Sequence, residues 1–316
     1  MGIPGIHHVT AICDDPQLNI DFFVGLLGLR LVKQTVNFDM PDTYHLYYGD
    51  EQGAPGTILT FFSWPDAPKG RLGAGQIGAV GFSIPLSSLE YWAERFDQLQ
   101  QPVYGPVDRF DEKALTFTSP DGMMLELVAH ADAERFTGWQ TGPIPAEHAI
   151  RGLHSVTLME SNVEATAELL TGTMGYQQVD RHGRRVRYST GSDALATRVD
   201  IMEFLTRQHG RVAIGSVHHV AWRTPTDEEQ LAWRGTLLAA GYNVTPVRDR
   251  QYFHSIYYNE PGGVLFEIAT DPPGFTFDEP LDQLGTHLKL PPWLESERPM
   301  LEKALQPLYL PPFEDE

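Results

Sequence analysis

A chain of 316 residues that is 41% hydrophobic and 21% charged holds enough apolar material for two cores of ordinary domain size, which excludes a disordered protein. Its formal net charge of −19 disfavours nucleic acids and anionic membranes as partners, because both are polyanions that bind Lys/Arg-rich surfaces. The sequence has no apolar run of the roughly 18 to 20 residues that span a bilayer and no signal-peptide pattern at its start, so we expect a cytoplasmic protein with small-molecule partners.

A unit of about 55 to 60 residues recurs four times along the chain, and each copy opens and closes with a short apolar strand. The copies cover residues 5–62, 77–127, 152–204 and 216–268. Because the opening strands share one pattern, they can be aligned position by position. The residues that correspond in them are His8, Ala79, Ser155 and His219.

Each copy continues with a segment of helical periodicity, and alternating segments typical of strands follow it. The predicted helices cover residues 18–27, 89–99, 163–174 and 228–240. Each copy is therefore one strand, one helix and three further strands. This pattern predicts an α+β fold of four βαβββ modules.

The modules divide the chain into three predicted parts. Residues 1–140 hold the N-terminal pair of modules, and residues 141–271 hold the C-terminal pair. Pro143 and Pro145 mark the linker between the pairs. From about residue 272 the chain becomes rich in proline, which predicts a tail that packs on the body, with one short helix near residues 295–305.

The two histidines at corresponding positions, His8 and His219, are the strongest functional signal. A single histidine at a strand edge is usually a surface or hydrogen-bonded residue. The other two modules keep the same apolar strand with Ala79 and Ser155, so the fold does not require imidazole there. Because neutral imidazole is a common ligand of zinc and iron, the pair indicates one shared metal.

Glu267 would complete this ligand set from the closing strand of the fourth module. Glutamates also occupy the matching place in modules two and three, and Thr60 occupies it in module one, so the residue type alone is a weak signal. Strand alternation puts Glu267 on the face opposite Phe266, toward the concave side of the sheet. A carboxylate desolvated there is costly unless a cation or donors meet it. The sequence therefore predicts a metal site of His8, His219 and Glu267.

Two neutral nitrogens and one carboxylate leave open positions on an octahedral ion, which is typical of non-haem Fe(II) oxygenases, with zinc as an alternative. The sequence has no Gly-x-Ser-x-Gly elbow, and its single cysteine, Cys13, is expected to be a small buried apolar residue. We therefore expect metal-centred chemistry rather than a nucleophilic side chain.

Four modules with these ligand positions resemble the vicinal oxygen chelate superfamily of glyoxalases, bleomycin-resistance proteins and dioxygenases. More closely, the chain resembles the hydroquinone-type ring-cleaving dioxygenases. The motifs that carry this resemblance are GIHHVT at residues 5–10, SVHHVA at 216–221, LFEIA at 265–269 and LKLPPW at 288–293.

The resemblance implies two open β-barrels. Modules one and four form the barrel that holds the metal, and modules two and three form the barrel that holds none. The resemblance implies Fe(II) in the first of these barrels, held by His8, His219 and Glu267. It also implies substrate-binding or supporting positions for His7 and Thr10 and catalytic positions for His218, Arg250 and Tyr257.

Alternation along a regular strand turns His7 and His218 away from the metal face, so their role requires a twist or a bulge in each strand. The segment 44–48 and Trp64 are expected to be core or pocket wall rather than chemistry.

The resemblance implies an Fe(II)-dependent extradiol-type dioxygenase that opens the ring of a hydroquinone with O2. Zinc or manganese could replace iron in a purified sample, and a homo-oligomer is compatible with the family. A catechol is less favoured, since Ser155 stands where a catechol enzyme would place a histidine. The alternatives are a glyoxalase or epimerase relative, which should need a second carboxylate ligand, and a metal-free binding protein of the bleomycin-resistance type.

Overall fold

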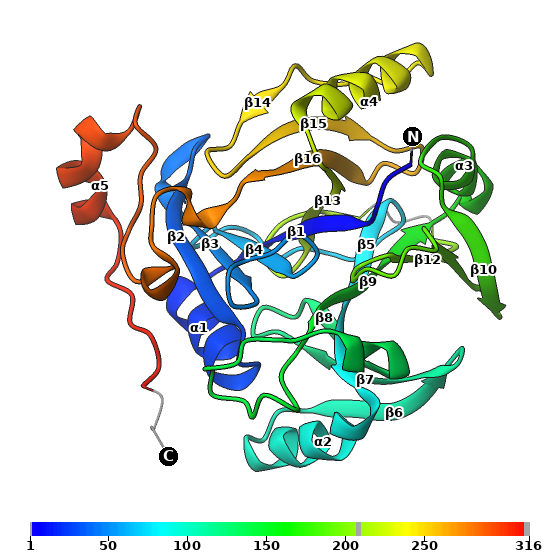
Figure 1. The fold of residues 1–316 in the computed structure, drawn as a ribbon, viewed down its shortest axis with the longest axis horizontal. Coiled ribbons are helices and arrows are strands. Elements are labelled where there is room, and N and C mark those ends of the chain that lie inside the picture. The colour runs from blue at the N-terminus through cyan, green and yellow to red at the C-terminus, as the bar shows by residue number, and fades with distance from the viewer. Residues whose placement is uncertain (1, 207–209, 313–316) are drawn as a thin grey trace.

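The computed structural model describes residues 2–206 and 210–312 and places its strands in two curled eight-stranded sheets (Figure 1). This confirms the α+β fold of two open barrels that the sequence predicts. No helix among the described residues is long and apolar enough to cross a membrane.

The first sheet combines modules one and four. β1 pairs antiparallel with β13, so the opening strands of the first and last modules lie side by side. This pairing brings distant parts of the chain together, as the resemblance implies. In sheet order the strands are β14 (Arg248–Asp249), β15 (Phe253–Asn259), β16 (Leu265–Pro273), β13 (Val217–Thr224), β1 (Ile6–Cys13), β4 (Ile58–Ser63), β3 (Met40–Gly49) and β2 (Arg30–Asn37).

The second sheet combines modules two and three in the same way, through an antiparallel pair of β5 and β9. Each sheet thus draws strands from both sides of residue 140, so the predicted boundary there separates module pairs along the sequence and does not separate the sheets. In sheet order the strands are β10 (Gln177–His182), β11 (Arg185–Ser189), β12 (Arg198–Glu203), β9 (Gly152–Glu160), β5 (Gln76–Pro85), β8 (Met124–His130), β7 (Glu112–Thr118) and β6 (Val103–Arg109).

The module helices are α1 (Pro16–Ile20), α2 (Leu89–Gln98), α3 (Val163–Glu168) and α4 (Asp227–Ala239). Two of them continue in a wider turn, since the segments Asp21–Leu26 and Leu169–Thr173 are π-helical. In both, an amide bonds to the carbonyl five residues earlier, as from Leu27 to Phe22 and from Met174 to Leu169. The sequence thus predicts the extent of these helices but not their change of pitch.

The opening strands are bulged, and the bulges place the histidines. The β1–β13 register shifts between Ile6 and His8, which leaves His7 unpaired, and a second shift leaves His218 unpaired. The β5–β9 pair shifts in the same places, and there the unpaired residues are Gly78 and His154. An extra residue in a bulge re-aims its side chain. His7 and His218 therefore need not follow the alternation of a regular strand.

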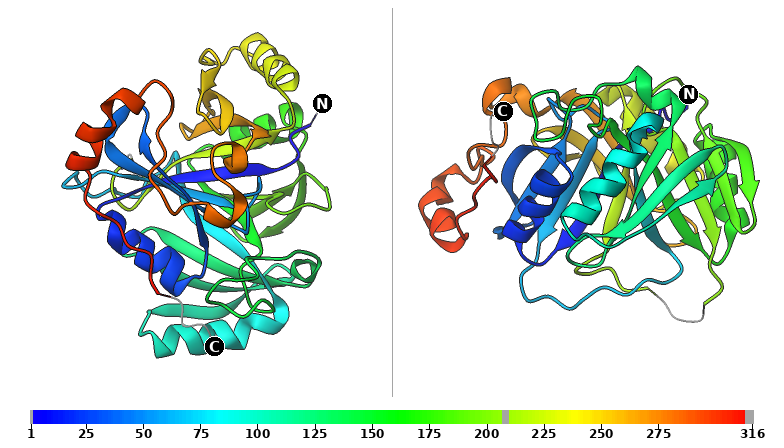
Figure 2. Two further views of the ribbon diagram at one scale, coloured as in Figure 1. Left: turned by 60° about the vertical axis from the view of Figure 1, so that its left-hand side comes forward. Right: turned by 90° about the horizontal axis from the view of Figure 1, so that it is seen from below.

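The C-terminal tail runs along the outside of β2, as both views of Figure 2 show, and ends in α5 (Arg298–Ala304) and an extended stretch. The amide of Lys289 donates to the carbonyl of Gln34 on β2. The fully buried Lys33 ammonium on the same strand bonds Glu279 and lies 2.6 Å from Asp278. The predicted short helix is confirmed, and the tail covers an edge that would otherwise be open.

A buried pair of carboxylates lies where β9 ends against the turn before β16. Glu160 is fully buried, and neither of its oxygens has a hydrogen-bond partner among the described residues. The approach of the turn is so close that a Cβ on Gly262 would lie 1.8 Å from Glu160 Oε2. Burial, with the neighbouring Glu260 charge, raises the pKa of Glu160 to about 8.

We expect Glu160→Gln to match the parent in stability near pH 5 and to exceed it by about 1–3 kcal/mol near pH 9. The folded state keeps a proton on Glu160 that the unfolded chain has already lost above its ordinary pKa, so the parent loses stability as pH rises toward 8. Urea unfolding at several pH values measures this difference. Glu203→Gln, at the matching end of β12, is the control substitution, and equal curves for the parent and Glu160→Gln at pH 9 would refute the assignment.

Candidate metal centre

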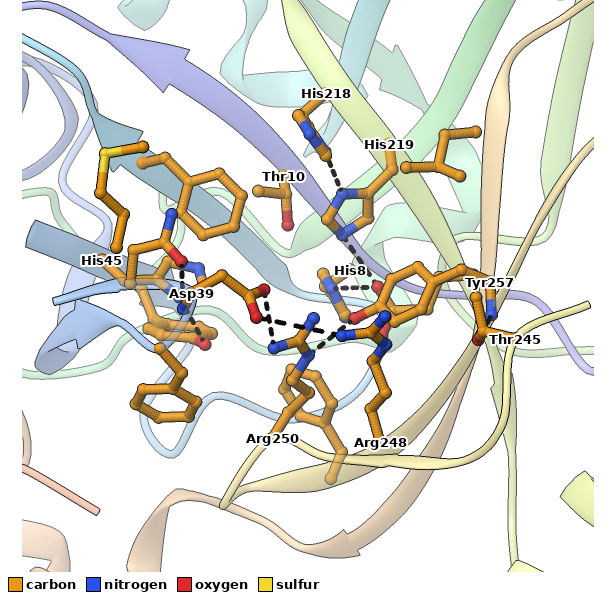
Figure 3. Close-up of a pocket in the computed structure, with 18 of the residues that line it drawn as sticks. His8, Thr10, Asp39, His45, His218, His219, Thr245, Arg248, Arg250 and Tyr257 are labelled. Carbon is orange, nitrogen blue, oxygen red and sulfur yellow. Dashed lines mark hydrogen bonds and ion pairs between the residues drawn. The ribbon is translucent and has the colours of Figure 1, made fainter. Parts of the chain in front are cut away.

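Three buried side chains from adjacent strands meet at the centre of the first sheet. His8 comes from β1, His219 from β13 and Glu267 from β16, and their ligand atoms all lie within 4.8 Å of one another. Glu267 Oε2 lies 2.8 Å from His219 Nε2 and 3.5 Å from His8 Nε2 (Figure 3). The structure therefore brings the three predicted metal ligands together.

The donor set fits a divalent cation. Glu267 Oε2 is buried and accepts no well-aligned hydrogen bond from the residues that the structure describes, although the two Nε2 atoms converge on it. Burial alone would raise the pKa of Glu267, but His8 and His219 outweigh it and hold that pKa well below the usual range. Burial lowers the pKa of His219, which favours the neutral imidazole that metals bind. An ionised carboxylate beside neutral imidazoles is a suitable ligand set.

The preceding histidine orients each candidate ligand. His7 Nδ1 lies 2.9 Å from His8 Nδ1, and His218 Nδ1 lies 2.7 Å from His219 Nδ1. The bulges turn His7 and His218 toward their neighbours, so both remain close to the centre despite strand alternation. A hydrogen bond at Nδ1 fixes the ring and leaves Nε2 for a metal.

A cavity of about 370 Å³ opens onto this centre. His8, His219 and Glu267 line it, and so does Thr10. Its walls are largely aromatic, which suits a flat apolar ring. The aromatic side chains that line it are Phe38, His45, Tyr47, Phe62, Trp64, His218, Phe253 and Tyr257.

Arg250 and Tyr257 form the polar side of the cavity (Figure 3). Arg250 Nε donates to Tyr257 Oη at 3.1 Å. Burial, with the charge of Glu267, raises the pKa of Tyr257, so its hydroxyl keeps its proton at neutral pH. Asp39 and Arg248 also reach this side of the cavity. A carboxylate oxygen of Asp39 lies 3.1 Å from the Arg250 guanidinium, and the other lies 3.9 Å from that of Arg248.

The sequence reasoning did not single out Asp39, Arg248 or His45. Arg248 could have been found, because it lies two residues before Arg250, and side chains two residues apart in an extended segment point to the same side. Asp39 lies at the exposed turn between β2 and β3, where an acidic residue is unremarkable in a sequence. His45 lies in a predicted strand of mixed aromatic and polar residues, where nothing distinguishes it from pocket wall.

In the second sheet an arginine meets the buried carboxylate that two imidazoles meet in the first sheet. Glu126 corresponds to Glu267, and it pairs with Arg109. Thr116 faces Glu126 as Tyr257 faces Glu267, so Arg109, seven residues before Thr116, corresponds to Arg250. The second sheet thus meets its buried carboxylate with a side chain of its own.

A second group of possible ligands, Glu112, His130 and His154, also lies in the second sheet. Arg187 bonds one oxygen of Glu112, and His154 Nε2 lies 2.8 Å from the other. Arg198 Nε is 3.6 Å from the same carboxylate. Guanidinium groups already supply the positive charge here, so this group is a poor cation site.

A model of the Glyoxalase/Bleomycin resistance protein/Dioxygenase superfamily matches residues 5–127 and 152–268. The chain is 45% identical over 303 residues to "Putative ring-cleaving dioxygenase MhqO" of Bacillus subtilis, with 96% of each chain covered. It is 34% identical over 309 residues to "Chlorohydroquinone/hydroquinone 1,2-dioxygenase" of Sphingobium indicum, again covering 96% of each.

Solved structures share the fold. A crystal structure of a "putative dioxygenase" from Bacillus subtilis matches with a TM-score of 0.93 and 43% identity, covering 98% of this chain and 99% of that one. Glyoxalase I from Zea mays matches with a TM-score of 0.63 and 14% identity, covering 90% of this chain and 97% of that one. At this identity the second match shows the architecture alone.

Proposed function

This chain belongs to the glyoxalase, bleomycin resistance protein and dioxygenase superfamily, as its motifs imply, and from that premise we propose that it is an Fe(II)-dependent extradiol-type dioxygenase. Its substrate would be a hydroquinone, whose aromatic ring it opens with O2. The observation that carries the proposal is the convergence of His8, His219 and Glu267 at the floor of an aromatic cavity. The names of its relatives support the same chemistry.

His8, His219 and Glu267 would hold the metal. When bound, a divalent iron supplies open coordination positions and a positive charge that lowers the pKa of a coordinated hydroxyl. His7 and His218 keep the two imidazoles oriented through their Nδ1 contacts. The side chains of the cavity bind and orient the ring and exclude water from it.

Tyr257 and Arg250 provide the charge and the proton on the polar side of the cavity. Tyr257 is protonated, and Arg250 donates to its oxygen, so its hydroxyl hydrogen can point toward a substrate oxygen. The Arg250 guanidinium stabilises negative charge that develops on that oxygen. Together they form a donor pair for a phenolate.

Thr60 makes the glyoxalase or epimerase alternative less suitable. It occupies the position in module one that Glu267 occupies in module four, and it carries a hydroxyl instead of the second carboxylate that proton-transfer members would need. The metal-free binding alternative does not account for two imidazoles and a carboxylate buried together, because such a group is costly without a cation.

The test is oxygen consumption by the reconstituted enzyme. Protein purified without oxygen and loaded with Fe(II) should consume one O2 per hydroquinone, and mass spectrometry with isotopically labelled dioxygen should find both atoms in an acyclic product. Zn(II)-loaded protein is the matched control and should be inactive. Absence of oxygen uptake, together with metal-dependent isomerisation of a hemithioacetal, would replace the proposal by the glyoxalase alternative.

A further inference from the structure

Four buried side chains form an unbroken hydrogen-bonded chain that ends at the cavity. Tyr47 Oη lies 2.9 Å from His45 Nδ1, and His45 Nε2 lies 2.8 Å from Thr60 Oγ1. Thr60 Oγ1 in turn lies 2.9 Å from Thr10 Oγ1. Thr10 and His45 line the cavity (Figure 3), as Tyr47 does, whereas Thr60 is fully buried and does not line it.

The hydrogen bonds of this chain have a preferred direction, because each hydroxyl group carries a single hydrogen that it can donate. His45 Nδ1 is the only hydrogen-bond partner of Tyr47 Oη in the part of the chain that the structure describes. If Tyr47 donates to Nδ1, its buried hydrogen is satisfied, and His45 must carry its own hydrogen on Nε2. His45 then donates to Thr60, and Thr60 donates to Thr10.

This direction leaves the hydrogen of Thr10 free for the cavity. In the reverse direction Thr10 would give its hydrogen to Thr60, and the hydroxyl hydrogen of the buried Tyr47 would have no acceptor among the described residues. Burial lowers the pKa of His45 well below its usual range, in keeping with a neutral imidazole that donates at one nitrogen and accepts at the other.

We propose that Thr60 and His45 are positioning residues that fix the Thr10 hydroxyl as a hydrogen-bond donor to an anionic oxygen of the substrate. This inference rests on the proposed function for the identity of that oxygen, a hydroquinone oxygen in its ionised form. Thr60 stands in the slot that Glu267 fills in module four, so module one contributes an oriented donor where module four contributes a carboxylate.

The test removes single hydroxyl groups without changing shape. Thr60→Val keeps the volume but breaks the link to His45, and Thr60→Ser keeps the link. Each variant is loaded with Fe(II), and equilibrium binding of 4-nitrophenol, whose phenol and phenolate forms absorb differently, is measured beside hydroquinone turnover. Thr60→Val should bind the phenolate about tenfold to a hundredfold more weakly, as expected for one hydrogen bond to a charged group, and Thr60→Ser should resemble the parent.

A double-variant cycle with Thr10→Val isolates the positioning role. If Thr60 acts through Thr10, adding Thr60→Val to Thr10→Val should cause no further loss of 4-nitrophenol affinity. Tyr47→Phe removes the hydroxyl that sets the direction of the hydrogen-bonded chain, and it should cause a smaller loss of 4-nitrophenol affinity. Equal metal content in Thr60→Val and Thr60→Ser, with the melting temperature of each well above the assay temperature, shows that the comparison is between folded, loaded proteins.

Parent-like affinity in Thr60→Val, or losses that simply add in the double variant, would overturn the proposal. These outcomes are distinct from failure of the proposed function. A parent protein that binds 4-nitrophenol but opens no hydroquinone ring would refute the function, and the affinity ratios would still decide the role of Thr60.

Discussion

Glu267→Gln is expected to lose the metal and to lower ring-opening activity by more than about a hundredfold. Substituting a residue that only supports a metal ligand typically lowers activity by at most about a hundredfold, so a direct ligand should cost more. Gln keeps the shape of the side chain but removes the negative charge that His8 and His219 face. It also replaces a carboxylate whose other oxygen accepts from Ser255 Oγ. Elemental analysis of purified protein, beside oxygen uptake with hydroquinone, measures both effects.

The internal repeat supplies a matched control for this variant. Glu126→Gln makes the same change at the corresponding position of the second sheet, where Arg109 meets the carboxylate. It should retain a full metal complement and ring-opening activity, although it leaves Arg109 less well paired and lowers stability. Retention of stoichiometric metal by Glu267→Gln would remove Glu267 from the ligand set. Loss of metal from Glu126→Gln would show that the second sheet also holds an ion.

The candidate site could be predicted from the sequence because the chain repeats itself. His8 and His219 are distinguishable from ordinary strand histidines only when Ala79 and Ser155 are seen at the same place in the other modules. The repeat also gives the strand face of Glu267. A single module would have supported none of these inferences.

The bulges and the hydrogen-bonded chain could not be predicted in this way. A bulge at His7 or His218 depends on how β1 pairs with β13, which is about two hundred residues away along the sequence, and no local residue encodes that register. The link from Thr10 through Thr60 to His45 crosses three strands, β1, β4 and β3, so it becomes visible only after the strand order is known. The local sequence pattern determines which residues share a strand face, whereas the pairing of the strands determines which of those residues are in contact.

Arg187→Met is expected to destabilise the protein by about 3–5 kcal/mol, because removing one partner of a buried ion pair leaves uncompensated charge. Arg187 bonds Glu112 and lies 2.8 Å from Asp200, and both carboxylates are buried. It provides for the second sheet what a metal would provide for the first, a cation among buried acids. Urea unfolding of the metal-free protein measures the loss, so that metal binding does not contribute.

The pH dependence of the stability loss in Arg187→Met, and its rescue by further substitutions, distinguish the charge of Arg187 from its packing. Although burial raises both pKa values, His154 with Arg187 holds the pKa of Glu112 below its usual range, and Arg187 with Arg185 does the same for Asp200. This stabilisation is present above the pKa of an unfolded carboxyl, roughly 4, and is lost as pH falls below it, so the deficit of Arg187→Met should shrink in acid. Adding Glu112→Gln and Asp200→Asn should restore much of the stability, because the two buried side chains then carry no charge that Arg187 must offset. Arg185→Met, which removes a more exposed partner of Asp200, should cost less. A deficit that stays constant in acid and resists this rescue would mean that Arg187 acts through its volume and its contact with Phe110 instead of its charge.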